Sequence, residues 1–302
     1  MDNTAPVADA GSLRTIVRGA YDIQKLRIMT GNRIVGNFKA RLGQEPSQKE
    51  EEMSEDGKKI LRNLRQAFDK IIDGVKVFPR QANFKGNELI SSFTELSLLD
   101  EYFELERVES KHFLRLKHIL RDFPIWNEFL EPIRGVGPAM GGVIISEINI
   151  HAAKYPSSLH KYVGLDVVGG KGRSRKKEHL EESTYIDKDG KEQTKMGITF
   201  NPFLKTKLVG VLRSSFIKQP AEKSEYRRVY DDYKNRLENM PAHAEKSKGH
   251  RHNMAIRYVV KRFLIDLYNA WRPLEGLVVA PTYEEAKLGI KHGSADKYKK
   301  AA

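Results

Sequence analysis

The segment from Glu88 to Phe123 repeats apolar side chains at helical spacing and contains no proline. A helix of roughly 36 residues, at about 1.5 Å per residue, would span more than 50 Å. Such a length is unusual inside a compact domain and predicts a coiled-coil-like helix, whose partner lies either in the same chain or in a second copy of it. We also expect a homo-oligomer through this helix as one outcome. Because the first 130 residues show no strand pattern, the predicted fold class is mainly α.

Two shorter helical patterns precede this segment. The first runs from Leu13 to about Leu42, with Gly31 as the expected break or kink, and the second runs from Lys59 to Phe78, where Pro79 ends it. The polar run between them, Gln44 to Lys58, predicts a solvated linker. We therefore expect a disordered tail at residues 1–12 and a helical, coiled-coil region at 13–130.

The chain changes character after Pro124, where glycines become frequent. We predict an α-helical domain at 131–273 and a basic tail at 274–302. An Asp189-Gly190 turn between short polar arms predicts a small β-hairpin insertion at Thr184 to Thr194. The predicted helices of this half span Pro202 to Lys218, Ala221 to Glu238 and Met254 to Trp271.

The composition points to a polyanionic partner. The formal net charge is +13 and the pI is near 9.6, a balance that favours nucleic acid or anionic surfaces. The chain has no cysteine, which excludes disulfides and thiolate metal sites. No apolar run approaches the roughly 18 residues of a membrane span, and no secretory signal is recognised. We expect a cytoplasmic, nucleoid-associated protein without a membrane partner.

The sharpest local motif is a glycine turn, Gly135-Val136-Gly137-Pro138, followed by an apolar helix. A Gly-hydrophobic-Gly step that opens a helix is typical of a helix-hairpin-helix unit. The glycines permit a tight turn that bares backbone amides for a phosphate oxygen, and Val136 would plug the turn into its own helices. The alternative is a glycine-rich helix start that packs closely and binds nothing.

A basic loop follows at Lys171 to Lys177, where five of seven residues are Lys or Arg. The predicted nucleic-acid contacts here are Lys171, Arg173, Arg175, Lys176 and Lys177. Glycines at 169, 170 and 172 favour a loop that moulds to a ligand, and the alternative is an ordinary solvated loop.

A third set of candidate contacts lies on the predicted helix at Pro202 to Lys218: Lys205, Lys207 and Arg213. An ordinary exposed helix face is an equal interpretation of these cations. Three tyrosines share one helical face at Tyr226, Tyr230 and Tyr233, and core packing is the favoured interpretation over base stacking. The histidines His243, His250 and His252 have no Cys or paired acid at ligand spacing, so no metal site is predicted.

From about Pro132 to Arg272 the order of these features resembles the C-terminal domain of the Piv/MooV-type insertion-sequence transposases. The stretches that carry the resemblance are Ile133 to Pro138, Tyr155 to Ser158, Leu159 to Leu165, Gly169 to Lys171, Asn201 to Ile217, Lys248 to His250 and Ala255 to Tyr268. The resemblance implies a DNA-binding protein of the transposase or site-specific recombinase type. Structured RNA is a further partner that it implies.

The chain also departs from that family at the residues that perform the chemistry. Family members hold divalent metal on the acids of a strand-rich N-terminal domain, which is not recognised here, so Mg²⁺ would act only if a partner supplied acidic ligands. Their nucleophilic serine stands before the Gly-Gly step, where this chain has Val168. Ser174 lies a few residues later among basic neighbours and is the candidate nucleophile. The alternative function is a catalytically inactive accessory or architectural protein that binds DNA or RNA.

Overall fold

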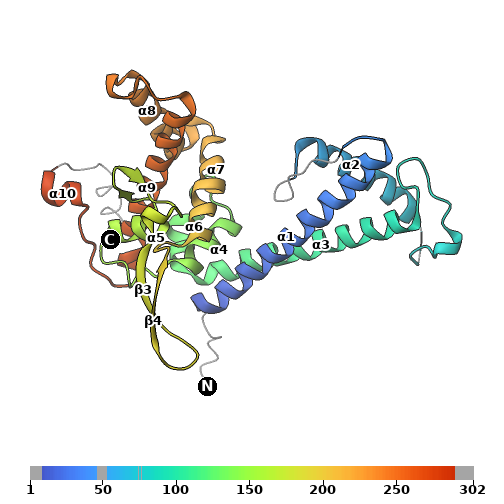
Figure 1. Ribbon diagram of the computed structural model, residues 1–302, viewed down its shortest axis with the longest axis horizontal. Coiled ribbons are helices and arrows are strands. Elements are labelled where there is room, and N and C mark those ends of the chain that lie inside the picture. The colour runs from blue at the N-terminus through green and yellow to red at the C-terminus, as the bar shows by residue number, and fades with distance from the viewer. Residues whose placement is uncertain (1–8, 46–52, 74, 76, 290–302) are drawn as a thin grey trace. The chain divides into compact units, whose positions relative to one another are not determined.

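A computed structural model describes residues 9–45, 53–73, 75 and 77–289. The fold is mainly helical with two small antiparallel hairpins, which confirms the predicted fold class. The chain divides into two compact units (Figure 1). Residues Thr15–Leu116 form the N-terminal unit, and Met1–Arg14 together with Lys117–Ala302 form the C-terminal unit.

In the described residues, the N-terminal unit contains most of α1 (Ala10–Arg41), all of α2 (Glu55–Ile72), most of α3 (Phe93–Ile119) and a 3-10 turn, η1 (Gln81–Asn83). Helices α1 and α3 run antiparallel, because Arg27 pairs with Glu109 whereas Arg41, further along α1, pairs with Glu95, nearer the start of α3. The long helix therefore finds its partner within the same chain. A homo-oligomer through α3 stays a prediction.

Helix α3 has 27 residues and is shorter than predicted. Ser92 ends the preceding loop, because its hydroxyl accepts the Glu95 amide at 3.2 Å, while the Glu95 carboxylate accepts the Ser91 amide at 2.6 Å. These reciprocal bonds satisfy amides at the helix start in the manner of a capping box. The residues before them are held by the Asn87 side chain, which accepts the amides of Leu89 and Ile90. The apolar periodicity across 88–92 was therefore not a helical signal.

The predicted break at Gly31 is wrong, because α1 continues through it to Arg41. A Cβ at this position would lie 2.5 Å from Met53 Cε and 2.8 Å from Tyr102 Cε2. Glycine here permits close packing of α1 against α3. Helix α1 also begins at Ala10, inside the predicted tail, and residues 1–8 lie outside the described part of the chain.

The C-terminal unit surrounds the long helix α9, and the predicted helices are present with shifted ends. Its α-helices are α4 (Pro138–Glu147), α5 (Pro156–Val163), α6 (Pro202–Lys205), α7 (Arg213–Ile217), α8 (Glu225–Asn239), α9 (Lys248–Leu274) and α10 (Tyr283–Leu288). Its shorter helical turns are η2 (Leu120–Asp122), η3 (Trp126–Leu130), η4 (Lys177–His179), η5 (Thr206–Leu212), η6 (Ala221–Lys223) and η7 (Pro241–His243). The end of the predicted basic tail, residues 290–302, lies outside the described residues.

An aromatic cluster forms the centre of this unit. The buried Phe263 of α9 contacts the rings of Phe129, Phe216 and Tyr226 at centroid distances of 5.6–6.2 Å. Tyr226 and Tyr230 are both buried, as core packing predicts. None of the described helices combines the length and apolar character needed to cross a bilayer.

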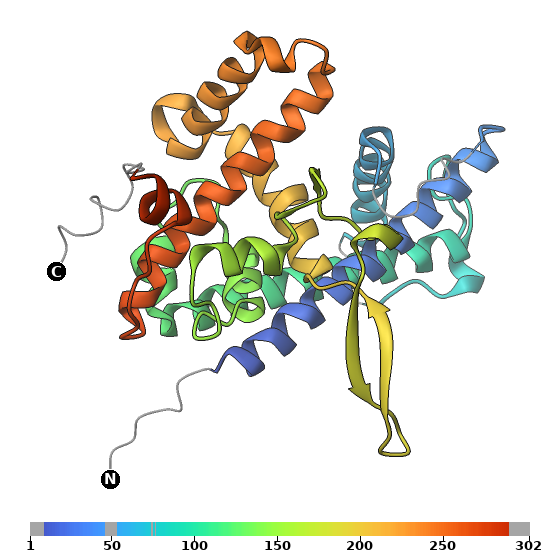
Figure 2. The same ribbon diagram turned by 60° about the vertical axis from the view of Figure 1, so that its left-hand side comes forward.

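Two antiparallel hairpins interrupt the helices. Strands β1 (Val167–Val168) and β2 (Lys171–Gly172) are joined by Gly169 and Gly170, whose φ angles are 55° and 75°. Strands β3 (Glu181–Ile186) and β4 (Glu192–Gly197) form the predicted insertion, which is longer than expected. Every residue of β3 is exposed, and Figure 2 shows this second hairpin as a ribbon that projects from its unit.

Helix α4 tests how tightly the C-terminal core is packed. A Cβ on Gly141 would lie 2.3 Å from Trp126 Cζ3, so Gly141→Ala forces the indole or the helix to move. We expect the free energy of unfolding to fall by about 1–3 kcal/mol, measured by urea denaturation. The control is Gly249→Ala near the start of α9, where no heavy atom lies within 4 Å. The control should leave stability unchanged or raise it by up to about 1 kcal/mol; equal losses in both variants would contradict the packing argument.

Candidate nucleic-acid interface

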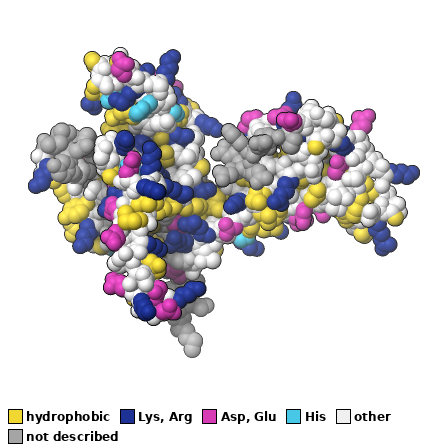
Figure 3. Space-filling view, in the orientation of Figure 1, with side chains coloured by type: hydrophobic (Ala, Val, Ile, Leu, Met, Phe, Trp, Pro, Cys, Tyr) yellow, Lys and Arg dark blue, Asp and Glu magenta, His cyan; other side chains and the backbone are white. Residues whose placement is uncertain are grey.

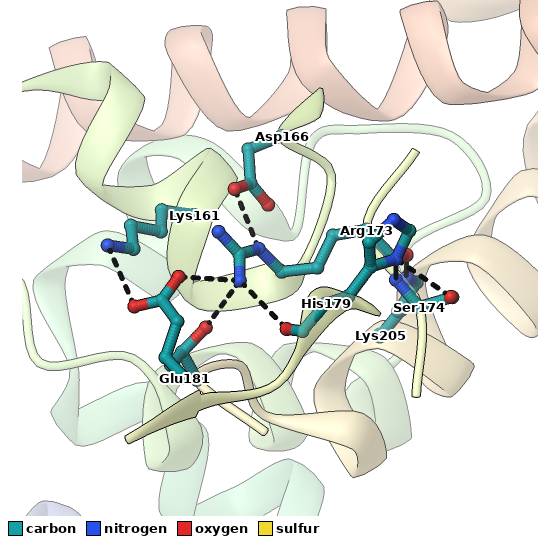
Figure 4. A network of polar contacts seen from close by, with 8 residues as sticks. Lys161, Asp166, Arg173, Ser174, His179, Glu181 and Lys205 are labelled. Carbon is teal, nitrogen blue, oxygen red and sulfur yellow. Dashed lines mark hydrogen bonds and ion pairs between the residues drawn. The ribbon is translucent and has the colours of Figure 1, made fainter. Parts of the chain in front are cut away.

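The predicted contact residue Arg173 is buried, with 6% of its side chain exposed. Its Nε donates to Asp166 at 2.7 Å, and its Nη1 donates to Glu181 at 2.8 Å and to Thr199 at 2.9 Å. Figure 4 shows this guanidinium among its partners. Hydrogen bonding to Asp166 raises the pKa of Arg173 above its ordinary value. Its guanidinium is thus engaged by partners inside the protein, and this burial argues against the predicted contact between Arg173 and nucleic acid.

The network of Arg173 ties together segments that are separate in the sequence. Asp166 precedes β1, Glu181 begins β3, and Thr199 follows β4. The Arg173 amide also donates to the Asp166 carbonyl, and its own carbonyl accepts the Lys205 ammonium at 2.7 Å. The buried side chain of Arg173 therefore fixes the base of both hairpins, and its backbone carbonyl attaches them to α6 through Lys205.

The Gly169-Gly170 step is a tight turn and not a loop that moulds to a ligand. Both residues have positive φ, as the two central residues of a type I′ hairpin turn require. No heavy atom lies within 4 Å of a Cβ built on either glycine, so the backbone conformation, and not close packing, explains them. The glycines shape the hairpin that presents Lys171.

Four of the predicted contact residues remain exposed: Lys171, Arg175, Lys176 and Lys177. None of them forms an ion pair with a described residue. Backbone bonds hold the loop that carries them, because the His179 amide donates to the Lys176 carbonyl and the Leu180 amide donates to the Lys177 carbonyl. The loop therefore presents uncompensated positive charge from a fixed backbone. Figure 3 shows Lys and Arg side chains gathered on this face of the C-terminal unit.

Ser174 lies beside a buried histidine, His179. The Ser174 Oγ and the His179 Nδ1 are 2.9 Å apart, and the Ser174 amide donates to the same nitrogen at 2.9 Å. Because a backbone amide can only donate, Nδ1 is an unprotonated acceptor and the ring proton is on Nε2. The Ser174 Oγ in turn accepts the Lys176 amide at 3.3 Å. The serine and histidine thus stabilise the loop turn.

Two further cations converge behind the loop. Lys205 is half-buried, and burial together with the nearby Arg257 lowers its pKa. Burial also lowers the pKa of Arg257, whose guanidinium lies under Gly172: a Cβ there would be 2.8 Å from Arg257 Cζ. Arg257 Nη2 is buried without an acceptor among the described residues. The sequence predicted Lys205 as a contact but not Arg257. A single arginine in a long, mostly apolar helix gives no sign of a binding role.

The glycine turn has the predicted local geometry, with one correction. Gly135 has a φ of 97°, and Val136 is buried with 7% exposed, which fits a plug. The Val136 amide donates to Ile133 O at 3.0 Å, so it is not bared. Gly137 is exposed and is the N-cap of α4, which receives no side-chain cap. The amides available to an anion are therefore those of Gly137 and Ala139, because Pro138 has no N–H and the Met140 amide donates to the Gly137 carbonyl at 3.0 Å.

The remaining predicted contacts, Lys207 and Arg213, are half-buried. The Lys207 ammonium lies 5.4 Å from the centre of the Phe203 ring, and Arg213 Nη1 lies 3.5 Å from Asn253 Oδ1 of α9. The structure thus joins Lys205 to Arg173 directly, and it joins Ser174 to Arg173 through His179, whose carbonyl accepts from Arg173 Nη1 at 3.4 Å. It places the glycine turn against α7, where a Cβ on Gly135 would be 3.1 Å from the Phe216 ring.

The three histidines considered above do not gather. Tyr230 OH lies 2.6 Å from His252 Nδ1, and burial, together with Arg213 and Lys234, lowers the pKa of His252. Among the described residues, no group of three or more His, Asp or Glu side chains is arranged to hold a metal ion.

No family model, curated protein or solved structure matches the chain.

The role of Arg173 can be separated from nucleic-acid contact by Arg173→Gln. Glutamine leaves the carboxylates of Asp166 and Glu181 without their charged donor, so we expect the free energy of unfolding to fall by about 2 kcal/mol. Urea denaturation measures this loss. The neighbouring Arg175→Gln, on the exposed part of the same loop, should change stability by less than about 0.5 kcal/mol. A neutral effect of Arg173→Gln would contradict the anchoring role.

Proposed function

We propose that the C-terminal unit binds DNA through its sugar-phosphate backbone, as a protein of the transposase or recombinase type. The observation that carries this proposal is the basic loop. Arg173 is buried to fix the loop, while Lys171, Arg175, Lys176 and Lys177 face solvent without ion pairs to described residues. Because the loop backbone is already held, no backbone entropy is lost there when phosphates bind, and the cations release counterions from the nucleic acid.

The glycine turn supports the same proposal from a second position. Gly137 is exposed at the start of α4, and no heavy atom lies within 4 Å of the position of a Cβ there. An uncapped helix start offers amide donors and a positive dipole end to an anion. Contacts of this kind position a backbone and read no base sequence.

The likeness to insertion-sequence transposases gives the class of DNA transaction. In this proposal the chain holds DNA during transposition or recombination, and a partner supplies the acids that bind Mg²⁺. The accessory alternative keeps the DNA contact, or a contact with structured RNA, and removes the chemistry. Both alternatives share the basic loop and the glycine turn.

Charge reversal of the loop tests the binding proposal. We expect the variant with Arg175, Lys176 and Lys177 all changed to Glu to lose most of its affinity for a 30-base-pair DNA duplex. The slope of log affinity against log salt concentration should become shallower by roughly 2–3, since each lost phosphate contact removes about 0.9. Fluorescence anisotropy across a salt titration measures both quantities.

The matched control reverses three exposed cations on α2 of the N-terminal unit: Lys59, Arg62 and Lys70. The change in net charge is identical, so a loss confined to the loop variant locates the contact. Equal losses in the two variants would reduce the proposal to nonspecific attraction by net charge. Gly137→Leu adds a test of the turn, because its side chain has room yet would cover the α4 amides.

A second candidate function is phosphoryl transfer by Ser174. Its Oγ lies 2.9 Å from an unprotonated nitrogen of His179 in basic surroundings. Attack of Oγ on a phosphorus atom would form a bond from phosphorus to the serine oxygen and break the bond from phosphorus to a sugar oxygen. The serine proton would pass to His179 and from there to the departing oxygen, which leaves as a sugar hydroxyl. The backbone amide that already occupies Nδ1 would have to release it, which weighs against this step.

Ser174→Ala decides between the two. If the serine only stabilises the turn, duplex binding should change by less than about threefold, and no covalent protein–DNA adduct should form in either protein with Mg²⁺ present. Denaturing gel electrophoresis of end-labelled duplex and four-way junction DNA measures the adduct. An adduct that forms with the parent protein and disappears in the variant would establish the nucleophile.

A further inference from the structure

A second candidate site lies in the C-terminal unit, in a cavity of about 800 Å³ between α5, α8, α9 and the segment that leads into α10. Its lining residues include Tyr233 and Arg236 of α8 and Tyr258, Lys261 and Arg262 of α9. Cavities that bind small ligands are commonly about 300–1,000 Å³. None of the residues that line this cavity belongs to the basic loop or to the glycine turn.

The wall of this cavity contains two stacked aromatic rings. Tyr233 and Tyr258 have ring centroids 3.9 Å apart and an interplanar angle of 6°. Both side chains are half-buried, unlike the fully packed Tyr226 and Tyr230 on the same face of α8. A flat ligand can extend such a stack, because the outer face of an aligned pair presents the same π surface as a single ring.

Cations stand beside this stack on both helices. Arg236 follows Tyr233 by three residues on α8, and Lys261 and Arg262 follow Tyr258 by three and four on α9, spacings that place each cation on the face of its tyrosine. None of the described lining residues is Asp or Glu.

Arg262 has capacity for a further acceptor. Its Nη2 lies 3.9 Å from Asp266, while its Nη1 is buried without an acceptor among the described residues. Because Nη1 has almost no accessible surface, an anionic oxygen in the cavity would supply an acceptor once the Arg262 side chain turned toward it. The cavity wall thus combines an aromatic surface with cationic hydrogen-bond donors that can bind an anion.

This combination selects the chemical class of the ligand. A simple anion would use the cations but leave the stacked rings without a role, and an apolar ligand would use the rings but not the cations. A nucleotide uses both, because its base stacks and its phosphate pairs with Arg or Lys. The base must lie outside a duplex, because inside a duplex both of its faces are covered by the bases stacked above and below it.

We propose that the cavity between α5, α8 and α9 binds a nucleotide, with its base stacked on the Tyr233–Tyr258 pair and its phosphate among Arg236, Lys261 and Arg262. The site goes beyond the proposed duplex contact and uses other residues. The nucleotide comes either from an unpaired position of a nucleic-acid strand or from a free mononucleotide.

The test compares two probes of equal charge with the full-length protein. One is a labelled 12-nucleotide DNA single strand, and the other is the same backbone with abasic sites throughout. We expect the parent protein to bind the base-bearing strand about tenfold more tightly, within the range of base–aromatic stacking. Tyr258→Ala should remove this preference and leave abasic binding unchanged, whereas Tyr258→Phe, which keeps the ring, should retain it.

The matched control is Tyr185→Ala, which removes an exposed tyrosine from β3. It should preserve the preference. Arg236→Gln, an exposed position on α8, provides a second variant if Tyr258→Ala does not fold, and it should weaken binding of the base-bearing strand several-fold. Equal affinity of the parent protein for the two probes, or a preference that survives Tyr258→Ala, would overturn the proposal.

Competition by adenosine monophosphate distinguishes the two sources. If adenosine monophosphate displaces the labelled strand from the parent protein, the site also binds free nucleotides. If the base preference is present but no displacement occurs, the site binds only nucleotides of a strand. The loop variant described above keeps the proposals separate. If it binds duplex like the parent but the base preference persists, the duplex proposal fails and the cavity proposal stands.

Discussion

The buried ion cluster around Arg173 is the constraint on which the C-terminal surface depends. A guanidinium with 6% of its side chain exposed would be costly to bury without acceptors. The carboxylates of Asp166 and Glu181, with the Thr199 hydroxyl, meet that requirement. Each acceptor comes from the end of a different segment, so satisfying one charge also fixes the two hairpins relative to each other, and the Arg173 carbonyl links them to α6 by accepting the Lys205 ammonium. The solvent-facing cations inherit their positions from this arrangement.

The helical scaffold was largely predictable because apolar periodicity reports which face of a helix is buried. The errors occurred where a local polar bond or a close packing contact outweighed that pattern. Ser92 and Glu95 end the loop before α3 by capping, a signal present in the sequence as Ser-x-x-Glu. Gly31 was expected to interrupt α1, but its small size serves the contact with Tyr102. A glycine alone does not distinguish these two roles.

The candidate interface was predicted less completely, because a run of basic residues does not reveal which member turns inward. Arg173 and Arg175 are the same residue type in the same basic run, so the sequence does not distinguish them. Only the carboxylates of Asp166 and Glu181, which belong to no recognisable binding motif, identify Arg173 as the buried one. Arg257 of α9 was missed for the converse reason. The stacking of Tyr233 on Tyr258 joins residues of two helices, so helical spacing on α8 alone favoured a core role.

The exposed hairpin of β3 and β4 has a mechanical consequence. Its strands have no core beneath them, so bending or twisting the ribbon breaks no buried apolar contact and requires little energy. Its first residue, Glu181, is also an acceptor of Arg173. Thr199, which follows β4, is another acceptor, so a load on the ribbon tip would be transmitted through the Glu181 carboxylate and the Thr199 hydroxyl to the base of the basic loop. The hairpin would therefore move as a unit about its base, where it is attached to the buried guanidinium.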